Sequence, residues 1–121
     1  LPVLFVCEDN NLSILTPVAD RRSWSMTRVA RALDLPAREF ADDPVTVHRH
    51  TEELTARLPA YINCHTCRGN WHVGTGTDGP PEWDRLELVR RDLELLGLGA
   101  EAHAAEQRIA DHMRALWNER R

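Results

Sequence analysis

The hydrophobic and polar positions of the chain predict an alternation of short strands and amphipathic helices. The first seven residues form a continuous apolar run, which is typical of a strand buried on both faces of a parallel sheet. Later apolar positions recur either at every second residue, as in strands, or at helical spacing. The predicted strands cover residues 1–7, 39–41 and 60–68, and the predicted helices cover residues 25–35, 45–58, 82–96 and 100–119.

This order predicts an α/β fold with a parallel sheet flanked by helices, because alternating strands and helices form right-handed crossovers. A length of 121 residues with 42% hydrophobic composition suits one modest core, so we expect a single domain over residues 1–121. Ligands of such sheets lie beyond the carboxyl ends of the strands. Two polar loops, 8–12 and 68–78, are expected there.

Composition narrows the class of protein. The net charge of −4 offers no basic surface for nucleic acid, and no apolar stretch is long enough to span a membrane. The three cysteines are odd in number and do not suggest a secreted disulfide framework, so we expect a cytoplasmic protein. All 15 basic residues are arginine, which is typical of a GC-rich bacterial genome. The chain begins at Leu1 within a predicted strand, so we expect either that the chain has been cut or that another polypeptide supplies the part before it.

The first predicted strand is followed by Asp9, Asn10, Asn11 and Leu12. With that strand, this turn resembles the second half of the thiamine diphosphate-binding motif, and more narrowly the alpha subunit of the decarboxylating component of 2-oxo acid dehydrogenases. In that family a Gly-Asp-Gly turn opens the motif, and an apolar strand, two asparagines, a variable residue and a tyrosine close it. Asp9 and Asn10 stand at the asparagine pair, and Leu12 replaces the tyrosine. The residues that then match without a gap are Ile14, Thr16 and Pro17.

A second match lies in the segment 65–72, which is similar to the family's Thr-Tyr-Arg-x-x-Gly-His. Thr66, Arg68 and His72 agree with this pattern, whereas Cys67 replaces the tyrosine and Trp71 replaces the glycine. The resemblance spans nearly the whole chain but covers only the C-terminal half or less of a normal alpha subunit. It therefore implies the C-terminal part of a thiamine diphosphate-binding domain, as a fragment or as a split-gene half.

The resemblance implies a binding site for Mg²⁺ and thiamine diphosphate. Asn10 would give its side-chain oxygen to Mg²⁺ and Leu12 its main-chain carbonyl, which are hard oxygen ligands of the kind that Mg²⁺ prefers. His72 would reach the diphosphate as the residue nearest the chemistry, and Arg68 would assist. Asp9 adds a negative charge beside the diphosphate unless it faces an arginine. The alternative for Asp9 is that it accepts backbone hydrogen bonds in the turn.

The implied function is that of one subunit of an enzyme that decarboxylates a 2-oxo acid and transfers its acyl group. The partners would be a chain carrying the N-terminal half of the alpha subunit, a beta-like subunit donating the activating glutamate, and a lipoyl carrier protein. The chain alone would be inactive, because no residue in it can be assigned the role of that glutamate. Two alternatives stay open: a carboligase or transketolase-like subunit in specialised metabolism, and a non-catalytic scaffold derived from the family.

A different kind of site is suggested by Cys64 and Cys67, with His65 between them and His72 after them. Their C-x-x-C spacing invites a zinc or redox interpretation. Residues three apart on a strand point to opposite faces, however, and a second cysteine pair is missing. We therefore favour the magnesium–diphosphate interpretation.

Overall fold

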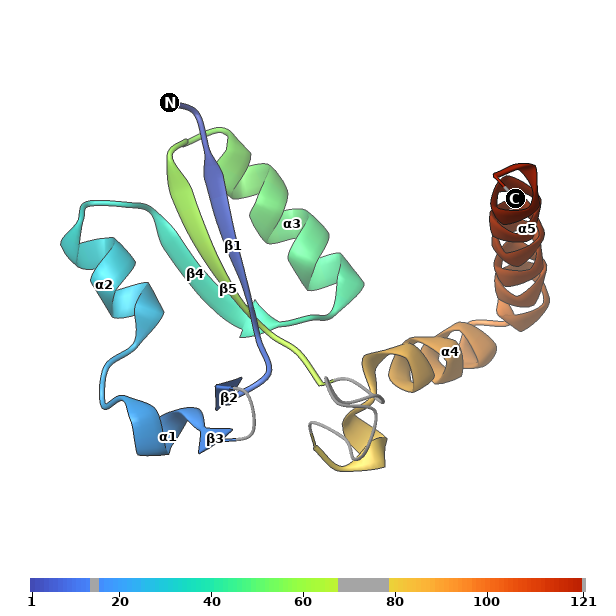
Figure 1. The fold of residues 1–121 in the computed structure, drawn as a ribbon, viewed down its shortest axis with the longest axis horizontal. Helices are drawn as coiled ribbons and strands as arrows, with labels where there is room; N and C mark the ends of the chain where they lie inside the picture. Colours follow the sequence, from blue (N-terminus) through green and yellow to red (C-terminus); the bar gives the residue numbers. More distant parts are fainter. Residues whose placement is uncertain (14–15, 68–78, 121) are drawn as a thin grey trace. The chain divides into compact units, whose positions relative to one another are not determined.

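The computed structural model describes residues 1–13, 16–67 and 79–120, and the chain divides into two compact units, Leu1–Arg85 and Leu86–Arg121. The first unit holds a three-stranded parallel sheet in the order β1-β5-β4 (Figure 1). Its strands are β1 (Leu4–Asp9), β4 (Ala37–Ala41) and β5 (Ala60–His65). The predicted α/β class with a parallel sheet flanked by helices is therefore confirmed.

Helices α2 (Met26–Ala32) and α3 (Pro44–Thr55) pack against β4 and β5. Ser25 caps α2, as its sequence position predicts, by accepting a hydrogen bond from the main chain of Arg28. Asp43 caps α3 through the main-chain N–H of Thr46 at 2.8 Å, and the proline that follows Asp43 is well suited to the first turn of a helix.

The alternation of β5 divides the core into two clusters. Ile62 and Cys64 pack with Leu54 of α3, whereas Tyr61 packs with Ala30 of α2. Leu54 is fully buried, and every residue of β5 except His65 is buried. The central strand, and not the apolar run at the start of the chain, is thus the strand that is covered on both faces.

Strand β1 differs from its prediction as a strand buried on both faces. Phe5 and Val6 are 50% and 59% exposed, because β1 lies at the edge of the sheet and pairs with β5 alone. Helices α2 and α3 pack mainly against β4 and β5, and Leu4 and Cys7 of β1 pack at the margins of the two core clusters. The apolar character of Phe5 and Val6 is not accounted for by burial within the described part of the chain.

The chain continues from β1 through a tight turn into two short antiparallel strands, β2 (Leu12–Ser13) and β3 (Thr16–Pro17), and the four-residue helix α1 (Val18–Arg21). The turn passes through Asn11, whose φ of 60° is a left-handed conformation that asparagine tolerates better than most residues.

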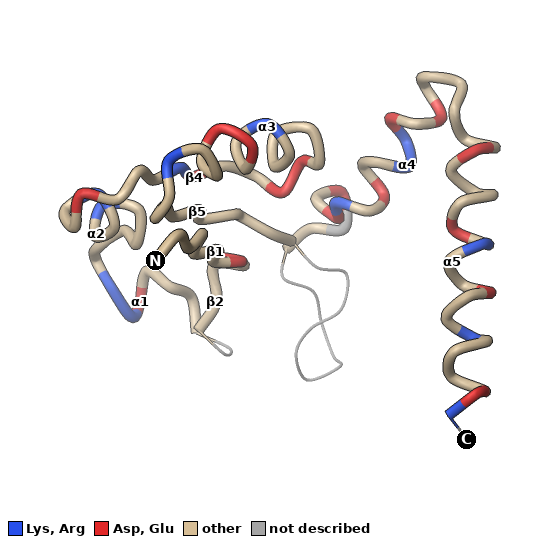
Figure 2. Tube along the Cα trace, turned by 90° about the horizontal axis from the view of Figure 1, so that it is seen from above, with Lys and Arg blue, Asp and Glu red and all other residues tan. Residues whose placement is uncertain are grey.

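The second unit consists of α4 and α5 (Gly99–Glu119), and α4 (Arg85–Leu95) begins at the last residue of the first unit. Gly97, with φ 73°, ends α4 in the left-handed conformation expected of a glycine at this position. Acidic and basic residues are interspersed along both helices (Figure 2). No helix in the described ranges has the length and apolar composition needed to cross a lipid bilayer.

Candidate site at the carboxyl edge of the sheet

A polar pocket of about 310 Å³ lies at the carboxyl ends of the three parallel strands. It is lined by residues that end or follow each strand, among them Asp9 and Asn10 after β1, Asp42 after β4 and His65 at the end of β5. Arg85, from the start of α4, completes the polar lining. The site thus lies at the edge of the sheet where the topology predicts ligands.

Asp9 is held in the turn by several donors. Its Oδ1 accepts the main-chain N–H of Asn11 at 2.9 Å, and its Oδ2 accepts the side-chain amide of Asn63 at 3.1 Å. The guanidinium of Arg22 lies 3.7 Å from Oδ2. Partial burial alone would raise the pKa of Asp9, but the hydrogen bonds from Asn63 and Asn11, with the charges of His65 and Arg22, hold this pKa below its usual value.

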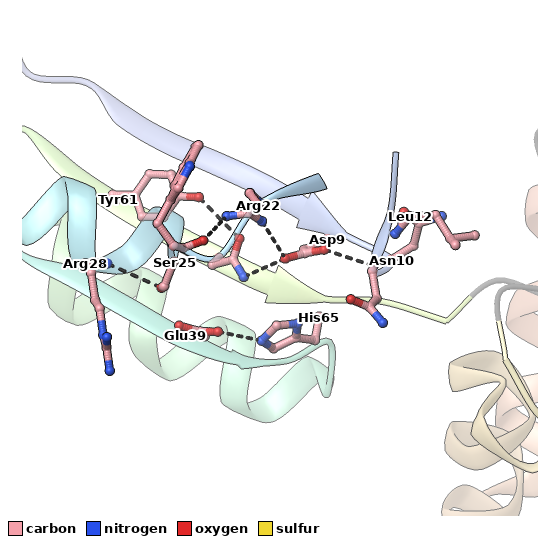
Figure 3. Close-up of polar contacts among 12 residues, drawn as sticks. Asp9, Asn10, Leu12, Arg22, Ser25, Arg28, Glu39, Tyr61 and His65 are labelled. Atoms are coloured by element: carbon pink, nitrogen blue, oxygen red, sulfur yellow. Dashed lines mark hydrogen bonds and ion pairs between the residues drawn. The ribbon is translucent and has the colours of Figure 1, made fainter. Parts of the chain in front are cut away.

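Arg22 is itself fixed in place by Trp24. One of its Nη atoms donates to the main-chain carbonyl of Trp24 at 3.0 Å, and the guanidinium lies over the Trp24 ring, 4.9 Å from its centre. On the other side, the buried Asn63 accepts a hydrogen bond from the Tyr61 hydroxyl at 3.2 Å. Both proposals for Asp9 are therefore observed together: it caps the turn, and it faces an arginine (Figure 3).

The two residues predicted as magnesium ligands occupy the same turn. Asn10 lines the pocket, and its Oδ1 is 3.4 Å from the main-chain nitrogen of Leu12, a long and weak hydrogen bond. Leu12 begins β2, where it pairs with Pro17. An amide oxygen held this loosely at a strand end can turn toward a hard cation.

The other two predicted residues, Arg68 and His72, lie outside the described residues. Thr66 and Cys67, which precede them, line the pocket. The main-chain N–H of Thr66 donates to the carbonyl of Asp9 at 2.9 Å and so continues the pairing with β1. The second match to the family motif therefore begins at the pocket that contains the first.

Two ion pairs of the site were not identified from the sequence. The Nε2 atom of His65 lies 2.9 Å from Oε1 of Glu39 in β4, and Nε of Arg85 donates to Oδ1 of Asp42 at 2.8 Å. The His65–Glu39 pair depends on the register between β4 and β5. The Arg85–Asp42 pair depends on the place where α4 begins. The available signals were the acidic turn that contains Asp42 and the position of His65 at a strand end.

The C-x-x-C cysteines line a separate, largely apolar pocket of about 480 Å³ on the α3 face of the sheet. The expectation that Cys64 and Cys67 lie on opposite faces does not hold there, because β5 ends at His65 instead of continuing to residue 68. Burial, followed by the charges of Asp42 and Glu8, raises the pKa of the Cys64 thiol. Across the ranges that the structure describes, no three His, Cys, Asp or Glu side chains form a metal-binding group.

Comparisons of the chain with protein families, with curated proteins and with solved structures give no match. The pocket itself combines an amide oxygen, carboxylates and two cationic side chains at the end of a parallel sheet. Such a donor set suits a ligand that contains both a hard divalent cation and an anionic group.

Proposed function

We propose that this chain is one subunit of a thiamine diphosphate- and Mg²⁺-dependent enzyme that acts on a 2-oxo acid. The observation that carries this proposal is the position of Asn10, which lies in a polar pocket beyond the carboxyl end of β1. The pocket also contains the beginning of the second family-like segment, at Thr66 and Cys67. The first sequence resemblance and the beginning of the second thus line one pocket instead of lying on different faces.

In this proposal the turn after β1 holds the metal. Asn10 would supply its side-chain oxygen and Leu12 its main-chain carbonyl, and further oxygen donors would come from the diphosphate, from water and from a partner chain. The charge of Asp9 is compatible with this arrangement, because Arg22 and the amide of Asn63 already compensate it. Asp9 then serves to shape the turn and is not itself a metal ligand.

Arg68 and His72 remain proposed contacts of the diphosphate. An imidazole can donate a hydrogen bond to a phosphate oxygen, and a guanidinium can bind two oxygens of one phosphate. Thiamine diphosphate would supply the electron sink that the decarboxylation of a 2-oxo acid requires. The chain's own part is to bind and orient the cofactor.

The proposed assembly contains a chain that completes the sheet, a beta-like subunit that donates the activating glutamate, and a lipoyl carrier protein. The open edge of β1 supports the first of these partners. Its hydrogen-bonding edge and the exposed Phe5 and Val6 are features that proteins usually cover, because uncovered apolar edge strands promote aggregation. A further strand from a partner would pair with this edge and help to cover Phe5 and Val6.

The test is co-purification from the native host, followed by calorimetric titration of the assembly with thiamine diphosphate and Mg²⁺. We expect saturable binding by the wild-type assembly and a loss of about tenfold or more in affinity for Asn10→Ala, because one charge-assisted contact is removed. Asn118→Ala, on α5, serves as the control and should bind like the wild type. An assembly that takes up no cofactor would contradict the proposed function, and unchanged binding by Asn10→Ala would contradict the assignment of the metal site.

A further inference from the structure

A histidine and an arginine of the pocket, His65 and Arg85, each contact a carboxylate that orients the side chain. Glu39 lies 2.9 Å from Nε2 of His65, and Asp42 lies 2.8 Å from Nε of Arg85. His65 and Arg85 line the same pocket as Asn10, although they come from different elements. Figure 3 shows the His65 ring beside Glu39. Their side chains are 49% and 27% exposed, so both can be reached by a ligand.

The hydrogen bonds fix which atoms remain for a ligand. The Glu39 carboxyl has a lowered pKa, and the nearby Thr27 hydroxyl and then His65 are the causes that lower it most. The Thr27 hydroxyl is buried and makes no hydrogen bond of ordinary geometry among the described residues. The Nε2 atom of His65 faces Glu39, which leaves Nδ1 as the nitrogen that can act on a ligand. Arg85 uses Nε for Asp42 and retains its two terminal nitrogens.

We infer that His65 and Arg85 bind an anionic phosphoryl group in this pocket, and that Glu39 and Asp42 act as positioning residues. The inference rests on the proposed function, since it assigns to this chain's described residues a contact with the diphosphate. It adds a second set of anion contacts to those expected of Arg68 and His72. The ligand class follows from the donors: a guanidinium, together with an imidazole ring nitrogen that can carry a proton, suits phosphoryl oxygens.

The charges around the pocket agree with this ligand class. The carboxylates of Asp9, Asp42 and Glu39 are matched by Arg22, by Arg85 and, when it is protonated, by His65. A divalent cation at Asn10 then makes the pocket positive, and a diphosphate restores the balance. Without a metal, the same carboxylates would oppose a free anion, so we expect Mg²⁺ and diphosphate to bind together.

Other ion pairs of the chain provide matched controls. His50 faces Glu53 at 3.5 Å, and Arg90 donates to Glu106 at 3.0 Å. Neither His50 nor Arg90 lines the pocket at the end of the sheet. They therefore reproduce the chemistry of a carboxylate-held histidine or arginine at a different location.

The first experiment uses nitrogen-15 NMR of the histidine side chains of the full chain, titrated with Mg²⁺ and inorganic diphosphate. We expect the His65 ring signals, assigned by their loss in His65→Gln, to shift and saturate, while those of His50 do not move. Inorganic diphosphate without Mg²⁺ should produce a much smaller shift. A His65 signal that is unchanged at saturating Mg²⁺ and diphosphate would overturn the inference.

The second experiment uses calorimetry of the purified assembly with thiamine diphosphate and Mg²⁺. His65→Gln keeps an amide donor for Glu39 but removes Nδ1, and Arg85→Gln removes the guanidinium. Each should weaken binding about tenfold or more, whereas His50→Gln and Arg90→Gln should bind like the wild type. Circular dichroism verifies that each variant is folded.

The Glu39→Gln variant tests positioning separately. It should alter the nitrogen-15 shifts of His65, which report its tautomer, and weaken binding less than His65→Gln does. An unaltered His65 tautomer would contradict the role of Glu39.

The two experiments separate the two proposals. If the assembly binds thiamine diphosphate and the His65 and Arg85 variants bind it equally well, the inference fails and the proposed function stands. If the assembly does not bind thiamine diphosphate but the His65 signals shift with Mg²⁺ and inorganic diphosphate, the proposed function fails and the phosphoryl site stands. If neither ligand binds, both are wrong.

Discussion

Removing the carboxylate of Asp9 should destabilise the turn that holds Asn10. In Asp9→Ala, the side-chain amide of Asn63 loses its acceptor, and Asn63 is only 3% exposed, so water cannot easily replace it. Leaving such a buried donor unsatisfied costs about 1–3 kcal/mol. The ion pair with Arg22, at 3.7 Å, adds at most about 1 kcal/mol. The N–H of Asn11 is exposed and can bind water instead.

We therefore expect Asp9→Ala to lower the free energy of unfolding by about 2–3 kcal/mol. Asp9→Asn keeps an oxygen that can accept the Asn63 amide, and it should lose about 1 kcal/mol. The control is Asp111→Ala, whose carboxylate is 69% exposed and paired only with Arg114, and which should change stability by less than about 0.5 kcal/mol.

The assay is urea unfolding followed by far-ultraviolet circular dichroism, with the slope compared among variants to confirm that the same transition is observed. A loss below about 0.5 kcal/mol for Asp9→Ala would refute the reasoning. It would mean that Asn63 finds another acceptor and that Asp9 does not hold the turn.

Three further predictions concern stability. Leu54→Ala, at the fully buried centre of the α3 cluster, should cost about 2–5 kcal/mol in urea unfolding, whereas Leu95→Ala, 80% exposed, should cost under about 1 kcal/mol; equal costs would contradict the assigned core. Gly97→Ala should cost about 1 kcal/mol, because the new Cβ meets no atom within 4 Å and only the left-handed backbone is strained; an unchanged melting curve would contradict this. The pKa values of Asp9 and Glu39 are lowered in the folded protein. The stability that these carboxylates contribute is therefore complete above their unfolded pKa values, near about pH 4, and is lost as the pH falls through the folded values. Unfolding free energies that stay constant from about pH 5 to pH 3 would contradict this.

Much of the fold follows from periodicity in the sequence. The alternating apolar positions locate β5, and the N-cap serine and the glycine after α4 locate the ends of two helices. Parallel pairing follows from the alternation of strands and helices. The burial of β1 could not be predicted in this way. Its apolar run indicates that its faces favour burial, but it does not indicate which chain buries them.

The candidate site could be predicted only as far as its local turn. Asn10 follows directly from the motif, because it and its neighbours are adjacent in sequence. The pairing of His65 with Glu39 joins residues 26 apart in the chain, and it depends on the register in which Ala41 faces His65 across β4 and β5. A shift of that register by one residue would move Glu39 to the other face of the sheet. Such pairs are determined by tertiary structure, and no local pattern marks them.

The most direct test of the central claim is the thiamine diphosphate content of the assembly purified from its native host in buffer containing Mg²⁺. The cofactor can be oxidised to its fluorescent thiochrome derivative and quantified against the amount of this chain. We predict a stoichiometric amount in the wild type and a large loss in Asn10→Ala. Wild-type assemblies that retain no thiamine diphosphate, even after incubation with excess cofactor and Mg²⁺, would contradict the claim.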